Sequence, residues 1–226
     1  MNKIDIMLDD AVPAGPVAKP GPRPGAHASV SYAQRIIDTP SLHEEVHNSG
    51  IANRNPDGLG LMALVAEDYR TQGDGFFSQG FWALFWHRFG NWRMSVEPKP
   101  LRAPLSLIYK IGAKLTQWFA GIDLPYTVNV GRRVRLEHFG GMVLVARAIG
   151  DDVTIRQNTT FGIARADRLR EWPVIGDGAD IGVGAAILGR VDVGRGAKIG
   201  ANAVVLKDIP EGAVAVGVPA RIVRKG

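Results

Sequence analysis

The residue types of this chain of 226 residues limit the acid–base and nucleophilic chemistry that it can do. The chain has no cysteine, which excludes disulfides, thiolate metal sites and a cysteine acyl-enzyme. It has five histidines, and only His138 lies in the C-terminal half. Imidazole titrates near neutrality, so a positioned His138 could take the proton of an attacking hydroxyl. A lone histidine is more often a bystander than a base, so the chemistry depends on what surrounds His138.

A repeat of six residues surrounds this histidine. Apolar residues recur at every sixth position, often followed by glycine, and the unbroken run is Ile175, Ile181, Ile187, Val193, Ile199 and Val205. A period of six is neither helical nor the alternation of a simple strand. We expect each unit to form one short strand and a turn, three units to form a triangular coil, and about four to five coils to stack around a continuous core.

The repeat is interrupted twice, between Leu136 and Ile149 and between Gly162 and Val174. An insertion in a solenoid maps to a projecting loop, often on the binding face. The first interruption contains His138, so the predicted site lies at these two breaks.

The residues before the repeat fall into two regions. Residues 1–57 are predicted to be a flexible tail, because residues 11–28 are rich in Pro, Gly and Ala and residues 32–55 are weakly patterned. One short helix is expected within 41–47. Residues 58–121 show helical spacing, and their third helix is expected over Leu105–Phe119, after three prolines. The predicted fold class is therefore α+β, a helical domain followed by a β-helix over 122–226.

The composition and net charge of the chain limit the kinds of partner that it is expected to bind. A net charge of +5 and a pI near 9.7 serve solubility or attract an anionic ligand. Nucleic acid is not expected, because no basic run is interleaved with aromatics and no helix-turn-helix or RNA-binding signature is present. No apolar run approaches the ~20 residues that span a bilayer, and no secretory signal is visible at the start. We expect a cytoplasmic protein without stable membrane insertion. Docking of the basic, aromatic helical region on a membrane is an alternative, although we see no clean amphipathic basic helix.

Three stretches carry a specific resemblance: GIDLPYTVNVGRRVRLEHFGGMVL, VGRGAKIGANAVVLKDIPEGAVAVGVPARIV and FWALFWHRFGNW. They resemble the serine acetyltransferase branch of the hexapeptide-repeat acyltransferases, and most closely its polysaccharide-cluster members of the colanic acid type. The resemblance covers about residues 59–225. It implies a left-handed parallel β-helix preceded by helices, a homotrimer or a dimer of trimers, acetyl-CoA as co-substrate and no metal.

The resemblance also implies roles for single residues. His138, in Leu136-Glu137-His138-Phe139-Gly140-Gly141, matches the family's general base, and Asp123 in Gly-Ile-Asp matches the carboxylate that orients it. The residues that match acetyl-CoA contacts are Gly162, Val183, Lys198, Ala201, Arg221 and Lys225. Packing at a corner of the coil explains Gly162 and Ala201 equally well. For Lys198, an exposed position on a solvated face of the β-helix is an equal explanation.

The acceptor side departs from the family. Serine acetyltransferases carry an Arg-His pair in a D-R-H-P context, and the matching stretch here is Arg170-Glu171-Trp172-Pro173. A carboxylate and an indole cannot hold a substrate carboxylate bidentately. Trp172 either offers an apolar platform to a sugar ring or anchors the loop. The expected acceptor-binding residues are Glu137, Trp172, Arg170 and Asp74, the last as a loose counterpart of a family aspartate.

These observations predict an acetyl-CoA-dependent O-acetyltransferase that acts on a sugar or exopolysaccharide intermediate. Serine O-acetylation, the first step of cysteine synthesis, is the alternative that shares donor and base. A non-catalytic trimeric scaffold is a third reading. A zinc carbonic anhydrase on the same fold would need three histidines around one metal, and the repeat has one.

Overall fold

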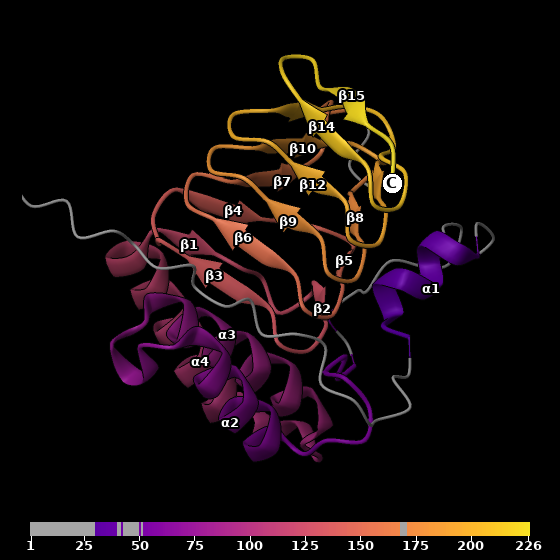
Figure 1. Cartoon of the computed structure of the whole chain (residues 1–226). Coiled ribbons are helices and arrows are strands. Elements are labelled where there is room, and N and C mark those ends of the chain that lie inside the picture. The colour runs from indigo at the N-terminus through magenta and orange to yellow at the C-terminus, as the bar shows by residue number, and fades with distance from the viewer. Residues whose placement is uncertain (1–29, 40–41, 43–49, 51, 168–170) are drawn as a thin grey trace, which may run out of the picture.

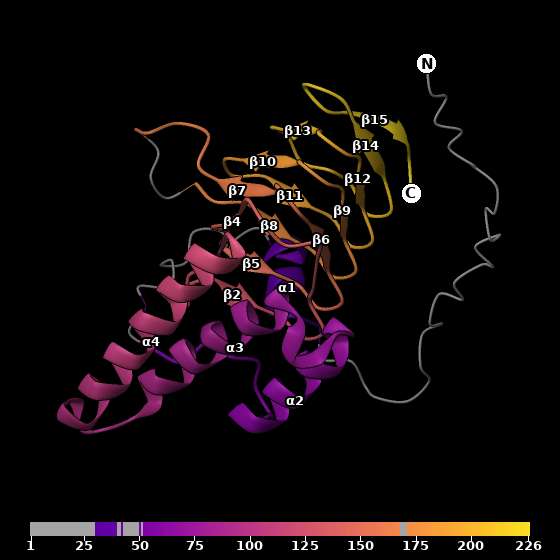
Figure 2. The ribbon, with the colours of Figure 1, turned by 90° about the vertical axis from the view of Figure 1, so that its left-hand side faces the viewer.

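The computed structural model describes residues 30–39, 42, 50, 52–167 and 171–226. A layer of helices lies at one end of a triangular stack of short strands (Figure 1). The layer contains α2 (Leu61–Gln72), η2 (Gly75–Phe77), α3 (Gln79–Trp92), η3 (Arg93–Ser95) and α4 (Lys99–Ala120). α3 contacts both α2 and α4, and α4 forms one side of the layer (Figure 2).

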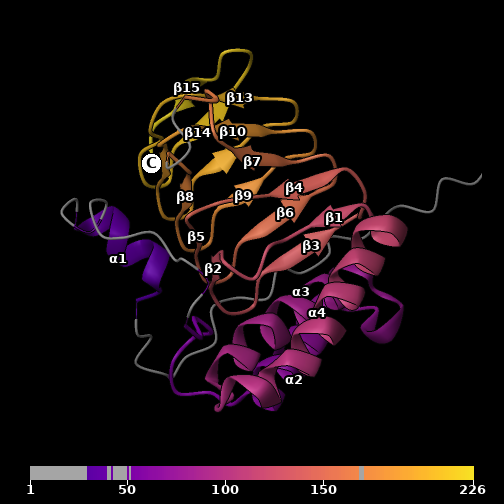
Figure 3. The ribbon, with the colours of Figure 1, turned by 180° about the vertical axis from the view of Figure 1, so that it is seen from behind.

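The strands form three faces, seen from behind in Figure 3. Sheet A contains β1 (Ile122–Asp123), β4 (Met142–Leu144), β7 (Thr160–Gly162), β10 (Ala186–Leu188) and β13 (Val204–Val205). Sheet B contains β2 (Asn129–Val130), β5 (Ala148–Ile149), β8 (Val174–Ile175) and β11 (Asp192–Val193). Sheet C contains β3 (Arg135–Glu137), β6 (Thr154–Arg156), β9 (Asp180–Ile181), β12 (Lys198–Ile199), β14 (Val214–Val216) and β15 (Arg221–Arg224).

Each strand pairs in parallel with the strand one coil away, except β15, which runs antiparallel to β14. The predicted fold class, a helical region followed by a left-handed parallel β-helix of about five turns, is confirmed.

The core of the β-helix is built from the apolar residues of the six-residue register. Phe161, Ile175 and Ile187 are completely buried, as are the small corner residues Ala185 and Ala203. Burying one large aliphatic or aromatic side chain contributes about 1.5–3 kcal/mol, so each coil adds to the stability of its neighbours.

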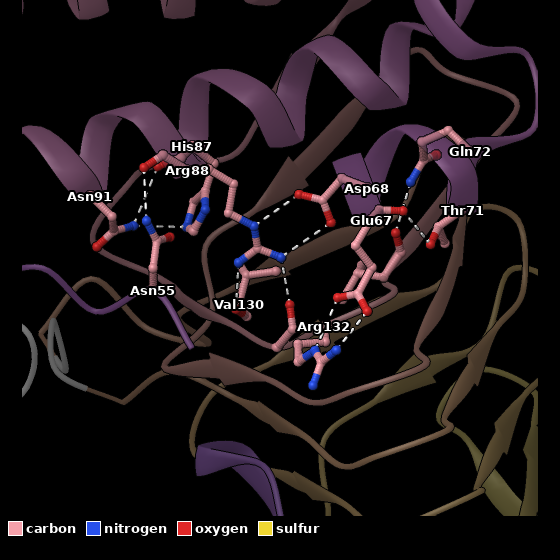
Figure 4. Close-up of polar contacts among 12 residues, drawn as sticks. Asn55, Glu67, Asp68, Thr71, Gln72, His87, Arg88, Asn91, Val130 and Arg132 are labelled. Atoms are coloured by element: carbon pink, nitrogen blue, oxygen red, sulfur yellow. Dashed lines mark hydrogen bonds and ion pairs between the residues drawn. The ribbon is translucent and has the colours of Figure 1, made fainter. Parts of the chain in front are cut away.

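Arg88 of α3 closes the open end of the β-helix. It is fully buried, and its Nη1 and Nη2 donate to the carbonyls of Val130 and Gly131 in the first coil, at 2.7 and 2.6 Å (Figure 4). Among the described residues β2 is the edge strand of its sheet, with no coil beneath it, so the guanidinium supplies the donors that these carbonyls would otherwise lack. Asp68 of α2 balances the charge, with Oδ2 2.9 Å from Nε of Arg88.

The expected tail and the expected start of the third helix both differ from the structure. Residues 32–38, expected within the flexible tail, form α1 (Tyr32–Asp38), which Ser31 caps and which buries Ile36 against β5 and β8. Apart from Leu42, the helix expected over 41–47 lies outside the described residues, as do residues 1–29 of the expected tail.

The third helix begins at Lys99 rather than at Leu105. Pro100 stands in its first turn, where a missing N–H costs no hydrogen bond, and Pro104 is accommodated within the helix. Among the described segments, no helix has both the length and the apolarity needed to cross a bilayer.

Candidate active site

One corner of the β-helix, where sheet C turns into sheet A, brings several of the predicted site residues together. His138 lies in the lowest turn of this corner, between β3 and β4, while Val183 and Ala201 lie in turns above it. Backbone hydrogen bonds join successive turns: Asn158 N donates to Gly140 O at 2.9 Å, Gly184 N to Gln157 O at 2.9 Å, and Asn202 N to Val183 O at 2.7 Å. We call this stack the C–A corner column, residues 138–141, 157–158, 183–184 and 201–202.

The turn that holds His138 is longer than the others. Leu136 and Leu144 both point into the core but stand eight positions apart, against six for Ile155 and Phe161. The turn closes with positive φ at His138 (53°) and at the two glycines that follow Phe139. A side chain with φ in this region is strained by about 1 kcal/mol or more, and such residues gather at functional sites. The imidazole of His138 is exposed at this strained turn.

Asp123 stands at the end of β1, the first strand of sheet A. The backbone ties β1 to the His138 turn, because Met142 N donates to Gly121 O at 2.9 Å. The half-buried carboxylate accepts a hydrogen bond from Nε2 of Gln117 on α4, at 2.7 Å. In the described part of the chain no hydrogen bond joins Asp123 to His138, so the orienting contact stays a prediction.

Glu137, expected on the acceptor side, is held by arginines of sheet C. Its Oε2 lies 3.3 Å from Nε of Arg156, and its Oε1 lies 3.4 Å from Nη1 of Arg135. Arg156 also pairs with Asp180 in the next coil. The Glu137 carboxylate is therefore already neutralised within its own sheet.

The other expected acceptor residues are dispersed. Asp74 is exposed at the start of η2, and this connection is tied to sheet C because Oε1 of Gln72 accepts from Leu136 N at 3.2 Å. Trp172 is half-buried between β7 and β8, in a connection whose described residues after β7, 163–167, project from the solenoid (Figure 2). Arg170 lies outside the described residues.

The residues expected to contact acetyl-CoA occupy two further places. Gly162 ends β7 on sheet A, where an added Cβ would meet only Cδ2 of Leu188, at 4.0 Å, so packing does not demand glycine there. Lys198 is exposed on β12, while Arg221 and Lys225 are exposed at the end of the β-helix far from the helices.

Sequence reasoning missed His87, which lines a cavity of about 230 Å³ together with Gln117 and Asp123. His87 is buried, and its Nε2 faces the carbonyl of Val128 at 2.9 Å, which makes that nitrogen the donor. Burial, helped by the nearby Arg88, lowers the pKa of His87 to about 3, so the ring is neutral at pH 7.

A signal for these residues was present in the sequence. His87, Arg88 and Asn91 are polar residues grouped on one side of an aromatic helix, the pattern of a polar network facing a neighbouring element. No group of three histidine or carboxylate side chains that could hold a metal ion occurs in the residues that the structure describes.

The chain is similar to proteins named serine acetyltransferase. The one from Mycobacterium tuberculosis is 34% identical over 149 residues, 66% of this chain and 62% of the relative. The one from Salmonella typhimurium is 38% identical over 150 residues, 66% of this chain and 52% of the relative. The match thus spans only about half to three fifths of these curated relatives. No family model matches the chain.

Solved structures give the same result. A truncated serine acetyltransferase apoenzyme is 31% identical, with a TM-score of 0.61 over 72% of this chain and 70% of that one. A serine acetyltransferase in complex with CoA is 30% identical, with a TM-score of 0.58 over 72% and 69% of the two chains. The fold and the C–A corner column together place this chain in the class of hexapeptide-repeat β-helix proteins.

Within this class, the chain belongs to the hexapeptide-repeat acetyltransferase family. The compared proteins carry the name serine acetyltransferase, so the narrower resemblance to the colanic acid type is not what the comparisons favour.

Proposed function

We propose that this chain transfers the acetyl group of acetyl-CoA to the hydroxyl of a small-molecule acceptor, with His138 as general base. The C–A corner column carries the proposal, because it places an exposed imidazole at the foot of a stack of turns that includes Val183 and Ala201. A pantetheine arm lying along this column would bring its thioester to His138.

The chemistry balances without a covalent enzyme intermediate. His138 takes the proton of the acceptor hydroxyl as its oxygen attacks the thioester carbonyl. When the tetrahedral intermediate collapses, the C–S bond breaks and the imidazolium returns the proton to the CoA sulfur. Asp123 is proposed to orient the imidazole during this exchange, and a backbone amide to stabilise the oxyanion.

Two features support acetyl-CoA as the donor. Gly162, Val183 and Ala201 have small side chains that allow a close approach of the thioester arm, and Lys198, Arg221 and Lys225 are exposed cations for its phosphates. A similar serine acetyltransferase was solved in complex with CoA, which supports the same ligand here.

L-serine is the acceptor that the comparisons support best. The relatives carry this activity in their names, and soybean serine acetyltransferase, 28% identical with a TM-score of 0.60, was solved complexed with serine. This replaces the sugar acceptor as the first choice. A sugar hydroxyl stays the second candidate, because Glu171 and Trp172 stand where the family's Arg-His pair would grip a carboxylate.

Assembly and location are also proposals. We infer a homotrimer, or a dimer of trimers, in which neighbouring subunits complete the site around the exposed His138. Sedimentation should then give three or six times the 24.3 kDa of the chain. A cytoplasmic location is proposed along with it.

The test is an acceptor screen with the purified full chain. Acetyl-CoA is incubated with L-serine, nucleotide sugars or glycan oligomers, and free CoA is measured. We expect release with L-serine and a loss of about 10²–10⁴-fold in His138→Ala, the usual contribution of a general base. Lys207→Ala, at an exposed position after β13, is the control that should retain activity.

Release with sugars alone would overturn serine and support the second candidate. No release with any acceptor, together with no CoA binding by calorimetry, would overturn the proposal and favour the scaffold.

A further inference from the structure

Helix α4 has an exposed apolar face that none of the described residues covers. Its buried residues, Gly112, Thr116 and Ala120, face the rest of the protein. Exposed apolar residues recur at helical spacing on the adjoining side of the helix: Leu101, Leu107, Ile108, Ile111, Leu115, Trp118 and Phe119. Trp118 and Phe119 are 72% and 81% exposed. We call these seven residues the α4 outer face.

The aromatic side of α3 adjoins this helix. Gly112 packs directly on the ring of Trp86, since a Cβ there would lie 2.2 Å from the indole. From Trp86, ring contacts run through Phe85 to Trp82, which is 38% exposed, and on to Phe76, which is 62% exposed. The helical layer thus carries exposed apolar side chains on α4, on α3 and in η2, more than single scattered residues would explain.

The charges of α4 have one sign. The helix contains Lys99, Arg102, Lys110 and Lys114 and no acidic residue, but Arg102 is mostly covered and pairs with Glu97, which precedes the helix, at 3.4 Å. Lys110 and Lys114 are both exposed, one turn apart, beside the apolar residues Leu107 and Ile111. Pairing with the same face of a second copy would bring two rows of cations together, whereas helices that pair in this way usually place opposite charges beside the apolar seam. The charge favours an anionic partner.

We propose that the α4 outer face lies on an anionic lipid bilayer, in the plane of the membrane surface. A helix with Trp, Phe and Leu on one side and only basic charges is the type that binds in this way, with Trp118 suited to the headgroup level. Contact along one face requires no membrane-spanning segment. The inference goes beyond acetyl transfer and does not depend on which acceptor the corner column serves.

The sequence predicted this helix over Leu105–Phe119, because three prolines suggested a later start, and showed no clean basic amphipathic pattern. The structure begins it at Lys99, which adds Lys99, Leu101 and Arg102 to the amphipathic pattern.

The test is co-sedimentation of the purified full chain with vesicles of phosphatidylcholine, with and without phosphatidylglycerol. We expect binding only with phosphatidylglycerol, weakened by salt. Lys110→Glu with Lys114→Glu should lower the partition coefficient at least about 25-fold, since each basic residue near an anionic surface contributes about fivefold. Ile111→Glu should abolish binding. Val223→Glu, which makes the same charge change at an exposed position of β15, is the matched control and should bind normally.

Two results would overturn the proposal. One is wild-type binding that is absent, or that Ile111→Glu leaves unchanged. The other is an absence of vesicle binding together with a wild-type mass, in sedimentation without lipid, twice that of Ile111→Glu. That result would show that the α4 outer face is an interface between copies of the chain. Circular dichroism checks that each variant folds. CoA release by Ile111→Glu with a soluble acceptor should equal that of the wild type, so docking and catalysis are read separately.

Discussion

The guanidinium of Arg88 on α3 donates to the carboxylate of Asp68 on α2, with 2.9 Å between Nε and Oδ2 and 3.4 Å between Nη2 and Oδ1. Both side chains are buried, and the remaining guanidinium hydrogen bonds go to the first coil of the β-helix. Burial raises the pKa of Asp68, and the positive charge of Arg88 opposes that rise. One arginine thus joins two helices to the foot of the solenoid.

Replacing Arg88 should therefore destabilise the whole protein. Arg88→Met leaves the Asp68 carboxylate and two carbonyls without their donor, and breaking a buried ion pair costs about 3–5 kcal/mol. Urea unfolding measures the loss. The control is Arg132→Met, which breaks the partly exposed pair with Glu67 in the same region and should cost about 1 kcal/mol or less (Figure 4). Equal losses in the two variants would contradict the role assigned to Arg88.

His87 should make stability fall in acid. Burial lowers its pKa from 6.5 to about 3, so between these values the unfolded chain binds a proton that the folded chain does not. The free energy of unfolding therefore decreases as pH falls below about 6.5, by about 1.4 kcal/mol per pH unit from this group. In His87→Gln, which keeps a donor for the Val128 carbonyl, the slope should be shallower across this window. Denaturant unfolding at several pH values checks this, and parallel slopes would disprove it.

A substitution at Gly162 distinguishes a contact with acetyl-CoA from a role in packing the coil. An added Cβ has space in the single chain, so Gly162→Ala should leave the melting temperature nearly unchanged while raising the KM for acetyl-CoA about tenfold, equivalent to about 1.4 kcal/mol. Gly184→Ala is the opposite case. Its Cβ would lie 2.1 Å from Oδ1 of Asn202 at a φ of +69°, so it should lower stability. An unchanged KM in Gly162→Ala would remove Gly162 from the donor site.

Asp123 and His138 should behave as one unit in catalysis. Asp123→Asn should lower kcat, because a neutral amide holds the imidazole less well in the required tautomer, and the double variant with His138→Ala should be no slower than His138→Ala alone. Asp152→Asn, a surface carboxylate paired with Arg133, is the matched control. Additive losses would show that Asp123 acts independently of the base. Gln117→Leu tests whether the hydrogen bond to Asp123 limits that role.

Part of the site could be predicted because it follows the repeat. The spacing that places Ile181 and Ile199 one coil apart also stacks the turns after them, so Val183 and Ala201 fall into one column. Arg88 and His87 could not be assigned in this way. Their partners Val130 and Val128 lie 42 and 41 positions along the chain, on another element.

By itself, the sequence determined the β-helix and the position of its two interruptions, because a six-residue period is a local pattern that allows one regular coil. Only the tertiary structure decided that residues 32–38 dock on β5 and β8, that Arg88 closes the first coil, and that α4 has an apolar side that none of the described residues covers. These depend on which faces of distant elements meet. The apolar area that each element buries, and so its contribution to stability, depends on these long-range contacts. The local spacing of residues does not determine it.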